Sequence, residues 1–311
     1  MIPYEELKAL LEGRLSVWPY LEEARRLREA HFGRRVETCA ILNAKSGRCP
    51  SDCAFCAQSV KYRTKAPVYP LLSKEKILAA AQEAVQNGID RFSLVTSGIK
   101  LSKSEFNRLL NLLAEMKDRW PQLKLCASLG QLGLAELEAL KEAGLSRYHH
   151  NLETAESFYP RICSTQSWRD RLRTAEKVKE VGLSLCCGGI FGLGERATEI
   201  LELAHTLVAL APDSVPVNFL HPIPGTPLEG ARHLSPLKCL AILCVLRFLL
   251  PHTEIRLCGG REYNLRDLQA LALLPANALM VGHYLTTRGR LLAHDRQMIE
   301  DLGYFSNLMV S

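Results

Sequence analysis

Two kinds of segment, each with its own pattern of hydrophobic and polar positions, alternate along this chain. Short runs rich in apolar and β-branched residues are separated by longer stretches in which apolar residues recur every three or four positions, the spacing of one helix face. The longer stretches include residues 74–89, 134–144 and 171–182, and each has a glycine at its end that can cap a helix. The short runs predict eight strands, near residues 37–44, 91–97, 123–128, 147–153, 183–190, 214–220, 254–260 and 278–282.

A strand, a helix and a glycine-ended turn repeated eight times predict an α/β fold, a (β/α)8 barrel of the TIM type. An open doubly wound sheet is the alternative. Residues 1–35 precede the first strand and predict helices, so we expect an N-terminal helical extension (1–35) followed by the barrel and a C-terminal segment (36–311). Catalytic residues of such barrels lie at the carboxyl ends of the strands and in the loops that follow.

Charge and hydropathy narrow the class of protein. The N-terminus has early acidic residues and no apolar stretch of the signal-peptide type, so we expect a cytoplasmic protein. Lys238 and Arg247 interrupt the most apolar run, residues 237–251, which is too short for a membrane span and predicts a buried helix. The net charge of +6 comes without a long basic block, which argues against nucleic-acid binding and fits a small anionic substrate.

Eleven cysteines are many for a chain without an export signal, and three of them are clustered. Cys49, Cys53 and Cys56 follow the first predicted strand with the spacing Cys-x3-Cys-x2-Cys, in a loop that Gly47 and Pro50 help to turn. Structural zinc usually has four ligands, and no fourth Cys or His follows at the usual spacing. Three thiolates suit a [4Fe–4S] cluster with one iron left open to a ligand. A zinc knuckle is the alternative.

The segment CPSDCAFC resembles the cluster motif of the radical S-adenosylmethionine (SAM) superfamily. That resemblance implies a [4Fe–4S] cluster that binds SAM and cleaves it to a 5′-deoxyadenosyl radical, in a barrel with this loop after its first strand. The segments HHNLET, LCCGGIFGLGE, SVPVNFLHPIPGTPL and IRLCGGRE are similar to segments of the biotin synthase family, in the same order, over residues 35–285. This second resemblance implies sulfur insertion into dethiobiotin, with sulfur from an auxiliary iron–sulfur cluster. It also implies a flavodoxin- or ferredoxin-type electron donor and a homodimer.

The resemblance assigns ligand contacts to several residues. In the run RYHHNLE, strand alternation places His149, Asn151 and Glu153 on one face. Asn151 and Glu153 are then expected to hold the SAM ribose, and His149, Asn151 and Asn218 to contact dethiobiotin. His149 stands where the family has asparagine. Backbone contacts to SAM are expected from Thr96, Ser97, Gly98, Gly188 and Gly189. For each inward polar side chain, a structural hydrogen bond is the alternative.

The auxiliary cluster departs from the family pattern. The resemblance matches Cys126, Cys186 and Arg261 to ligands of a [2Fe–2S] cluster, but Ser93 stands where the third cysteine is expected. Cys187 and Cys258 appear where the family has serine. We therefore expect a rebuilt cluster held by Cys126, Cys186 and Cys258, with Cys187 and Arg261 as further candidates. A four-iron cluster is favoured, and the alternative is an empty site or a [2Fe–2S] site using Ser93 or Arg261.

The remaining cysteines, Cys39, Cys163, Cys239 and Cys244, are expected to pack in the interior. Two other functions stay open at this point. One is a different radical SAM enzyme that acts on an amino acid-like substrate, and the other is a non-catalytic iron–sulfur or zinc protein. The inner cysteines Cys126, Cys186 and Cys258 favour sulfur insertion, because neither alternative needs them.

Overall fold

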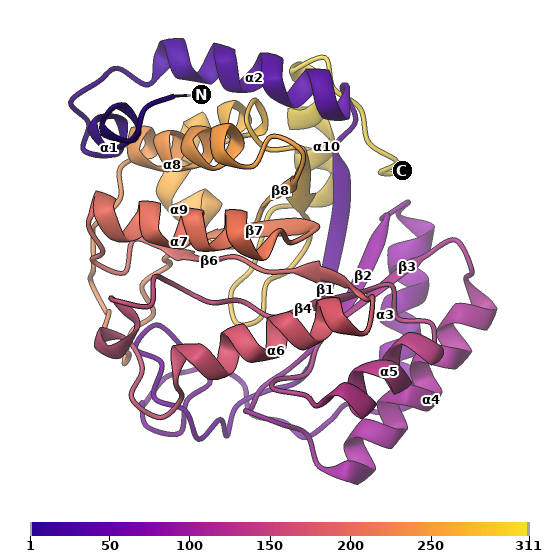
Figure 1. The fold of residues 1–311 in the computed structure, drawn as a ribbon. Helices are drawn as coiled ribbons and strands as arrows, with labels where there is room; N and C mark the ends of the chain where they lie inside the picture. Colours follow the sequence, from indigo (N-terminus) through magenta and orange to yellow (C-terminus); the bar gives the residue numbers. More distant parts are fainter. Residues whose placement is uncertain (1, 310–311) are drawn as a thin grey trace.

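The strands form a closed parallel barrel (Figure 1). The computed structural model describes residues 2–309. Its strand segments follow the order β5-β4-β3-β2-β1-β9-β8-β7-β6, and a pairing between β5 and β7 closes the sheet on itself. The alternative of an open sheet is therefore wrong. The segments are β1 (Glu37–Lys45), β2 (Arg91–Thr96), β3 (Lys124–Ser128), β4 (Arg147–His149), β5 (Ser184–Cys186), β6 (Gly189–Phe191), β7 (Ser214–Phe219), β8 (Glu254–Leu257) and β9 (Ala278–Met280).

The eight predicted strands are all present, but the fifth is broken into β5 and β6. Two glycines lie at the break because other backbone comes too close for a side chain. A Cβ atom on Gly188 would lie 2.2 Å from the carbonyl oxygen of Pro216, and one on Gly189 would lie 2.4 Å from that of Glu153. The fourth strand ends at His149, earlier than predicted, and Glu153 beyond it takes a left-handed backbone conformation with φ of 71°.

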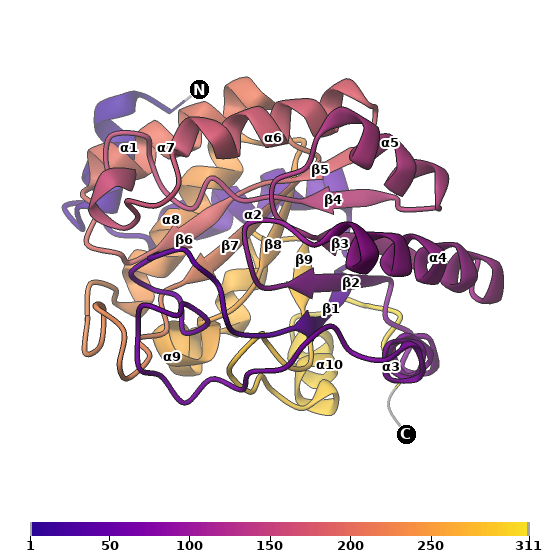
Figure 2. The same ribbon diagram turned by 90° about the horizontal axis from the view of Figure 1, so that it is seen from below.

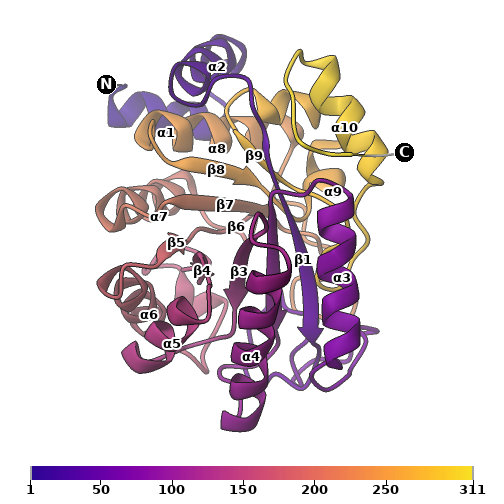
Figure 3. The ribbon, with the colours of Figure 1, turned by 90° about the vertical axis from the view of Figure 1, so that its right-hand side faces the viewer.

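Helices surround the barrel in the predicted alternation with strands (Figure 3). The helix α4 shows how the pattern works: Ser102 and Glu105 form a capping box at its start, and its apolar stripe, including Leu109 and Leu113, is buried. The helices of the ring are α3 (Lys74–Gln86), α4 (Lys103–Arg119), α5 (Leu134–Glu142), α6 (Trp168–Glu180), α7 (Ala197–Leu210) and α8 (Pro236–Leu249). The other helical segments are η1 (Tyr159–Arg161), which precedes α6, and α9 (Arg261–Leu265), η2 (Arg266–Leu268), η3 (Ala270–Leu273) and α10 (Leu292–Asp301), which follow α8.

The predicted buried helix is α8, and its burial depends on the N-terminal extension. Residues 239–247 of α8 are all buried, because α1 (Tyr4–Leu11) and α2 (Trp18–Phe32) lie over its outer face (Figures 1 and 3). The fully buried Arg28 of α2 donates hydrogen bonds to the carbonyl oxygens of Arg35 and Ala276, and so joins the extension to the segment before β9. The division at residue 35 stays a prediction. Within residues 2–309, no helix is long and apolar enough to cross a membrane.

Candidate functional site

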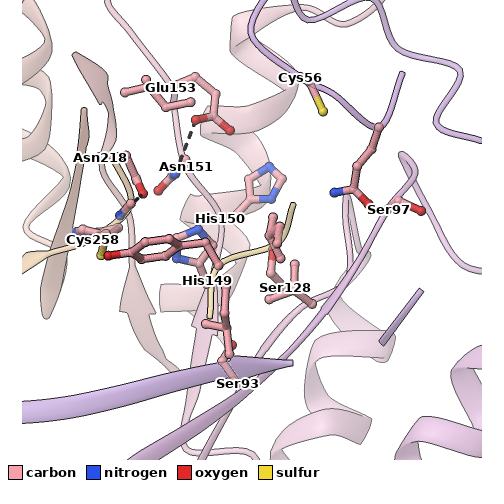
Figure 4. Close-up of a pocket in the computed structure, with 18 of the residues that line it drawn as sticks. Cys56, Ser93, Ser97, Ser128, His149, His150, Asn151, Glu153, Asn218 and Cys258 are labelled. Carbon is pink, nitrogen blue, oxygen red and sulfur yellow. Dashed lines mark hydrogen bonds between the residues drawn. The ribbon is translucent and has the colours of Figure 1, made fainter. Parts of the chain in front are cut away.

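The barrel encloses a cavity of about 380 Å³ that reaches from the loop after β1 to the inner faces of the strands (Figure 4). Most of the site residues predicted from the sequence line this one cavity, although they come from six different predicted strands and from the cysteine loop. They are Cys49, Cys53, Cys56, Ser93, Thr96, Ser97, Gly98, Cys126, His149, Asn151, Glu153, Cys186, Asn218 and Cys258. The site therefore lies where a parallel barrel is expected to carry it.

The cysteine loop is fixed by its own backbone and by one buried amide. The backbone of Cys49 pairs with that of Gln58 and Val60, at 3.1 and 2.9 Å, and the N–H of Cys56 donates to the carbonyl of Cys53 at 2.9 Å. The side-chain oxygen of Gln58 accepts from the N–H of Gly47 at 3.2 Å. Burial raises the pKa of the Cys56 thiol to about 11, so a metal must displace its proton on binding.

The segment after β2 supports this loop. The Ser97 hydroxyl donates to the carbonyl oxygen of Gly47 at 2.7 Å, and the Ser97 N–H donates to that of Lys45 at 2.9 Å. Gly98 has φ of 106°, which a residue with a side chain rarely adopts. Thr96, Ser97 and Gly98 thus form one wall of the cavity beside the three cysteines.

Asn151 and Glu153 form a polar pair on the opposite wall, held in place by Arg171. The Asn151 amide donates to the Glu153 carboxylate at 3.3 Å, and Arg171 donates to the same carboxylate at 3.3 Å and to the Asn151 carbonyl at 3.1 Å (Figure 4). The Asn151 side-chain oxygen accepts from the N–H of Gly188 at 3.1 Å. The carboxylate oxygens of Glu153 therefore face the cavity in a fixed orientation, suited to accept from hydroxyl groups.

Three further polar side chains lie deeper along the cavity. His149 places its Nδ1 atom 3.3 Å from the sulfur of Cys186, and burial lowers the pKa of this imidazole to about 4. Asn218 is oriented by two backbone groups, the carbonyl of Gly189 and the N–H of Gly259. His150, which the sequence analysis did not assign to the site, also lines the cavity, and its Nε2 atom is buried without a hydrogen-bond partner.

The inner wall carries four thiols, one more than predicted. Cys126, Cys186 and Cys258 line the cavity as expected, and Cys39 lines it beside them. Cys39 is buried, as expected of a packing residue, and it lines the cavity as well. Burial raises the pKa of all four thiols, that of Cys39 to about 12, and the charge of the Cys186 thiolate also raises the pKa of each of the other three. Strand parity could have found Cys39, because Ile41, two residues on, also faces the cavity.

Arg256 supplies positive charge next to these thiols. It is 2% exposed, lines the cavity and donates to the carboxylates of Glu254 and Glu37 through one nitrogen. Its other terminal nitrogen is buried without a partner. Arg91 and Arg147 also line the cavity and share the same two carboxylates, so three guanidinium groups face two carboxylates. A surplus of positive charge beneath the thiols is suited to an anionic cluster.

Two predicted cluster ligands do not reach the cavity. Cys187 is 0% exposed and packs in the apolar core, because it follows the inward Cys186 and points the other way. Arg261 lies outside the cavity in α9, where it donates to both oxygens of Asp295 at 2.9 and 2.7 Å and to the hydroxyl of Tyr284 at 3.0 Å. Its guanidinium group joins α9 to α10 and is not available to a metal.

Gly188 and Gly189 also fail to line the cavity. Their lack of side chains is explained by the close approach of Pro216 and Glu153, so the predicted contacts with SAM are not supported by their position. Ser93 does line the cavity, with its hydroxyl against the Cys126 thiol. Cys239 and Cys244 are buried in α8, as expected. Cys163 is buried too, but its sulfur lies 3.7 Å from that of Cys53.

The arrangement fits two clusters better than one metal ion. In the described part of the chain, no three His, Cys, Asp or Glu side chains are grouped closely enough to hold a metal ion together. The thiolates of a cubane cluster stand further apart, because each binds a different iron. Two of the orphaned buried atoms, on Arg256 and His150, face the cavity and provide unused hydrogen-bonding capacity there.

Comparisons with known proteins agree with this geometry. Residues 44–207 match the family model of the radical SAM superfamily, and residues 216–305 match that of the Biotin and Thiamin Synthesis associated domain. The chain is 50% identical to the biotin synthase of Desulforudis audaxviator, over 97% of this chain and 92% of the relative. It is 48% identical to that of Geobacter sulfurreducens, over 94% of this chain and 89% of the relative.

Solved structures show the same fold at low sequence identity. Methylornithine synthase aligns with a TM-score of 0.78 at 22% identity, covering 98% of this chain and 90% of that one. The FeFe-hydrogenase maturase HydG from Carboxydothermus hydrogenoformans aligns with a TM-score of 0.80 at 20% identity, covering 100% of this chain and 77% of that one. These two support the barrel, whereas the curated relatives identify the family. The chain belongs to the biotin synthase family of the radical SAM superfamily.

Proposed function

We propose that this protein forms biotin from dethiobiotin by radical sulfur insertion. The observation that carries the proposal is one cavity with two sets of thiols, three in the loop at its mouth and four on its inner wall. When bound, a [4Fe–4S] cluster would cleave two SAM molecules in turn, and each resulting radical would remove one hydrogen from one of two carbon atoms of dethiobiotin. An auxiliary cluster would supply the sulfide that joins these two carbons. The chain provides the binding sites for these groups and holds the substrate between them.

The polar residues of the middle cavity position SAM and dethiobiotin. The Glu153 carboxylate, held by Arg171, accepts hydrogen bonds from the SAM ribose, and Asn151 lies beside it. The backbone of Thr96, Ser97 and Gly98 contacts the SAM amino group. Asn218 can donate to and accept from the ureido ring of dethiobiotin, because backbone groups fix its orientation. His149 contacts the substrate while its Nδ1 atom stays near Cys186.

The inner thiols hold the auxiliary cluster. We propose that Cys126, Cys186 and Cys258 bind it, that Cys39 is a fourth thiolate ligand, and that the cluster contains four irons. Cys39, Cys126, Cys186 and Cys258 all line the inner wall, which is one thiolate for each iron of a cubane. Arg256 replaces Arg261 as the arginine of this site, because Arg256 lines the cavity and has one unpaired nitrogen, whereas Arg261 is bound to Asp295.

Anaerobic reconstitution tests this function directly. The protein, supplied with iron, sulfide, SAM, dethiobiotin and a reductant, is expected to form biotin and 5′-deoxyadenosine, both measurable by mass spectrometry. Formation of 5′-deoxyadenosine without biotin would refute sulfur insertion and favour another radical SAM activity. The family resemblance also leads us to propose a homodimer, which light scattering tests, and an external flavodoxin- or ferredoxin-type electron donor.

A further inference from the structure

The segment that follows the cysteine loop wraps around its outer side. Residues 46–73 form a long irregular stretch on the outside of the barrel between β1 and α3 (Figure 2). Polar side chains of this segment bind the backbone of the cysteine loop. The Ser59 hydroxyl donates to the carbonyl of Ser51, the Tyr62 hydroxyl to that of Asp52, and the Thr64 hydroxyl to that of Ala57 at 2.6 Å.

Basic residues alternate with these anchors and point outward. Lys61, Arg63 and Lys65 are exposed, whereas Tyr62 and Thr64 between them are partly buried. Arg48, next to Cys49, is exposed as well. We call Arg48, Lys61, Arg63 and Lys65 the loop-side basic patch. None of these four side chains forms an ion pair with another residue in the described range 2–309.

Little negative charge offsets this patch. Residues 48–65 contain four cationic side chains and one carboxylate, that of Asp52, so the segment carries about half of the chain's net charge of +6 in 18 residues. Asp52 itself faces the other flank of the loop, where it accepts from the N–H groups of Ser164 and Thr165 at 3.0 and 3.1 Å. The segment that covers the outer side of the three cysteines therefore carries a net charge of +3.

An electron carrier needs this side of the loop. Electron transfer between proteins slows steeply with distance, so a donor must dock close to the cluster that it reduces. The inner side of the loop faces the cavity, where SAM and substrate bind, which leaves the outer side for a protein. Charged patches at the rim of an interface act mainly by steering encounter and orienting the partner.

We propose that the loop-side basic patch is the docking surface for a small acidic electron-transfer protein of the flavodoxin type. The inference rests on the proposed function only in assuming that the loop carries the radical SAM cluster. The unpaired basic side chains attract the acidic surface of the donor, and the anchors Ser59, Tyr62 and Thr64 hold the patch against the loop.

The test compares a protein donor with a chemical one. The triple variant Lys61→Glu/Arg63→Glu/Lys65→Glu is supplied either with reduced flavodoxin or with dithionite, and 5′-deoxyadenosine formation is measured. We expect a loss of about tenfold or more with flavodoxin at low salt, and a change of less than about twofold with dithionite. Calorimetric titration of flavodoxin into the SAM-free protein provides a readout apart from activity, and the variant should show weaker binding with a flatter salt dependence.

A matched control makes the same charge change at the other end of the barrel. Arg34, Lys117 and Lys141 are exposed and lie before β1 and at the ends of α4 and α5, so Arg34→Glu/Lys117→Glu/Lys141→Glu should leave both donors effective. Equal losses with both donors, or equal losses in the control variant, would overturn the docking proposal. Unchanged flavodoxin binding would overturn it too. Failure to make biotin, with flavodoxin binding still dependent on the patch, would instead refute the proposed function.

Discussion

The two cysteine sets of this barrel differ in how they are built. Cys49, Cys53 and Cys56 lie within eight residues of one loop and are fixed by hydrogen bonds inside that loop. Cys39, Cys126, Cys186 and Cys258 come from β1, from β3, from β5 and from the end of β8, and they meet only because the barrel closes. A contiguous set depends on spacing, whereas a dispersed set depends on strand register and on which way each side chain points.

The two sets also differ in their surroundings. Of the loop thiols, Cys49 and Cys56 are partly exposed at the mouth of the cavity, whereas Cys53 is buried. The four inner thiols are all buried above the charged network of Arg256, Glu254 and their neighbours. On the assignment proposed above, the radical-forming site is accessible to SAM and electrons, while the sulfur source is enclosed and charge-compensated. Four predictions test it, from the largest expected effect to the smallest.

Removing the loop set should abolish radical formation and leave the inner cluster. The variant Cys49→Ala/Cys53→Ala/Cys56→Ala is expected to lose 5′-deoxyadenosine and biotin formation to background. Its iron content should fall from about eight to about four per chain, because only the inner site remains loaded. Mössbauer spectra and iron analysis measure this. About two irons per chain would contradict the four-iron proposal.

Removing the inner set should separate SAM cleavage from sulfur insertion. We expect Cys126→Ala/Cys186→Ala/Cys258→Ala to lose biotin formation, while 5′-deoxyadenosine formation changes by no more than about threefold. Cys187→Ala is the matched control, because Cys187 follows Cys186 but packs in the core. The control should keep its iron and lose about 1–2 kcal/mol of unfolding free energy from the small cavity. Loss of iron in the Cys187→Ala control would contradict the assignment of Cys126, Cys186 and Cys258 as the ligands of the inner cluster.

Cys39 decides whether the inner set has three or four ligands. Cys39→Ala should weaken retention of the auxiliary cluster by about 10-fold or more, seen as faster iron loss to a chelator. Cys244→Ala removes a thiol of the same size from the core of α8 and should leave iron retention unchanged. If Cys39→Ala retains iron and gives an unaltered Mössbauer spectrum, Cys39 is not a ligand.

Substitutions of Arg261 and Arg256 should have different effects, the first on the stability of the fold and the second on the auxiliary cluster. Arg261→Met removes the side chain that donates to both oxygens of the buried Asp295 and leaves only Arg290, at 3.9 Å. We therefore expect a loss of about 3–5 kcal/mol in unfolding free energy, with the auxiliary-cluster spectrum unchanged in the folded fraction. Arg256→Lys keeps the charge but removes the fork of donors, and should alter that spectrum and lower biotin formation. Thermal unfolding and Mössbauer spectra distinguish them. An altered cluster spectrum in Arg261→Met would restore the original assignment.

Much of the fold could be predicted from residue patterns. The features that could not be predicted depend on contacts that exist only in the folded barrel. The period of apolar residues located every strand and the buried helix α8. It could not show that the fifth strand breaks at Gly188, where the carbonyl of Pro216 leaves no room for a side chain, because that carbonyl comes close only in the folded barrel. Nor could it show that α1 and α2 cover α8 and let an apolar helix with Arg247 stay buried.

The sequence by itself determined the barrel, the loop of Cys49, Cys53 and Cys56, and the family resemblance. Periodicity and ligand spacing are local, so they can be read without knowing the tertiary structure. Strand alternation sorts neighbouring side chains onto two faces, but only the tertiary structure decided which of the other side chains share one cavity. It turned Cys39 and Arg256 into the cavity and placed Cys187 and Arg261 outside it. The physical reason is that neighbouring strand residues face opposite sides, so a shift of one position moves a ligand from the cavity to the core.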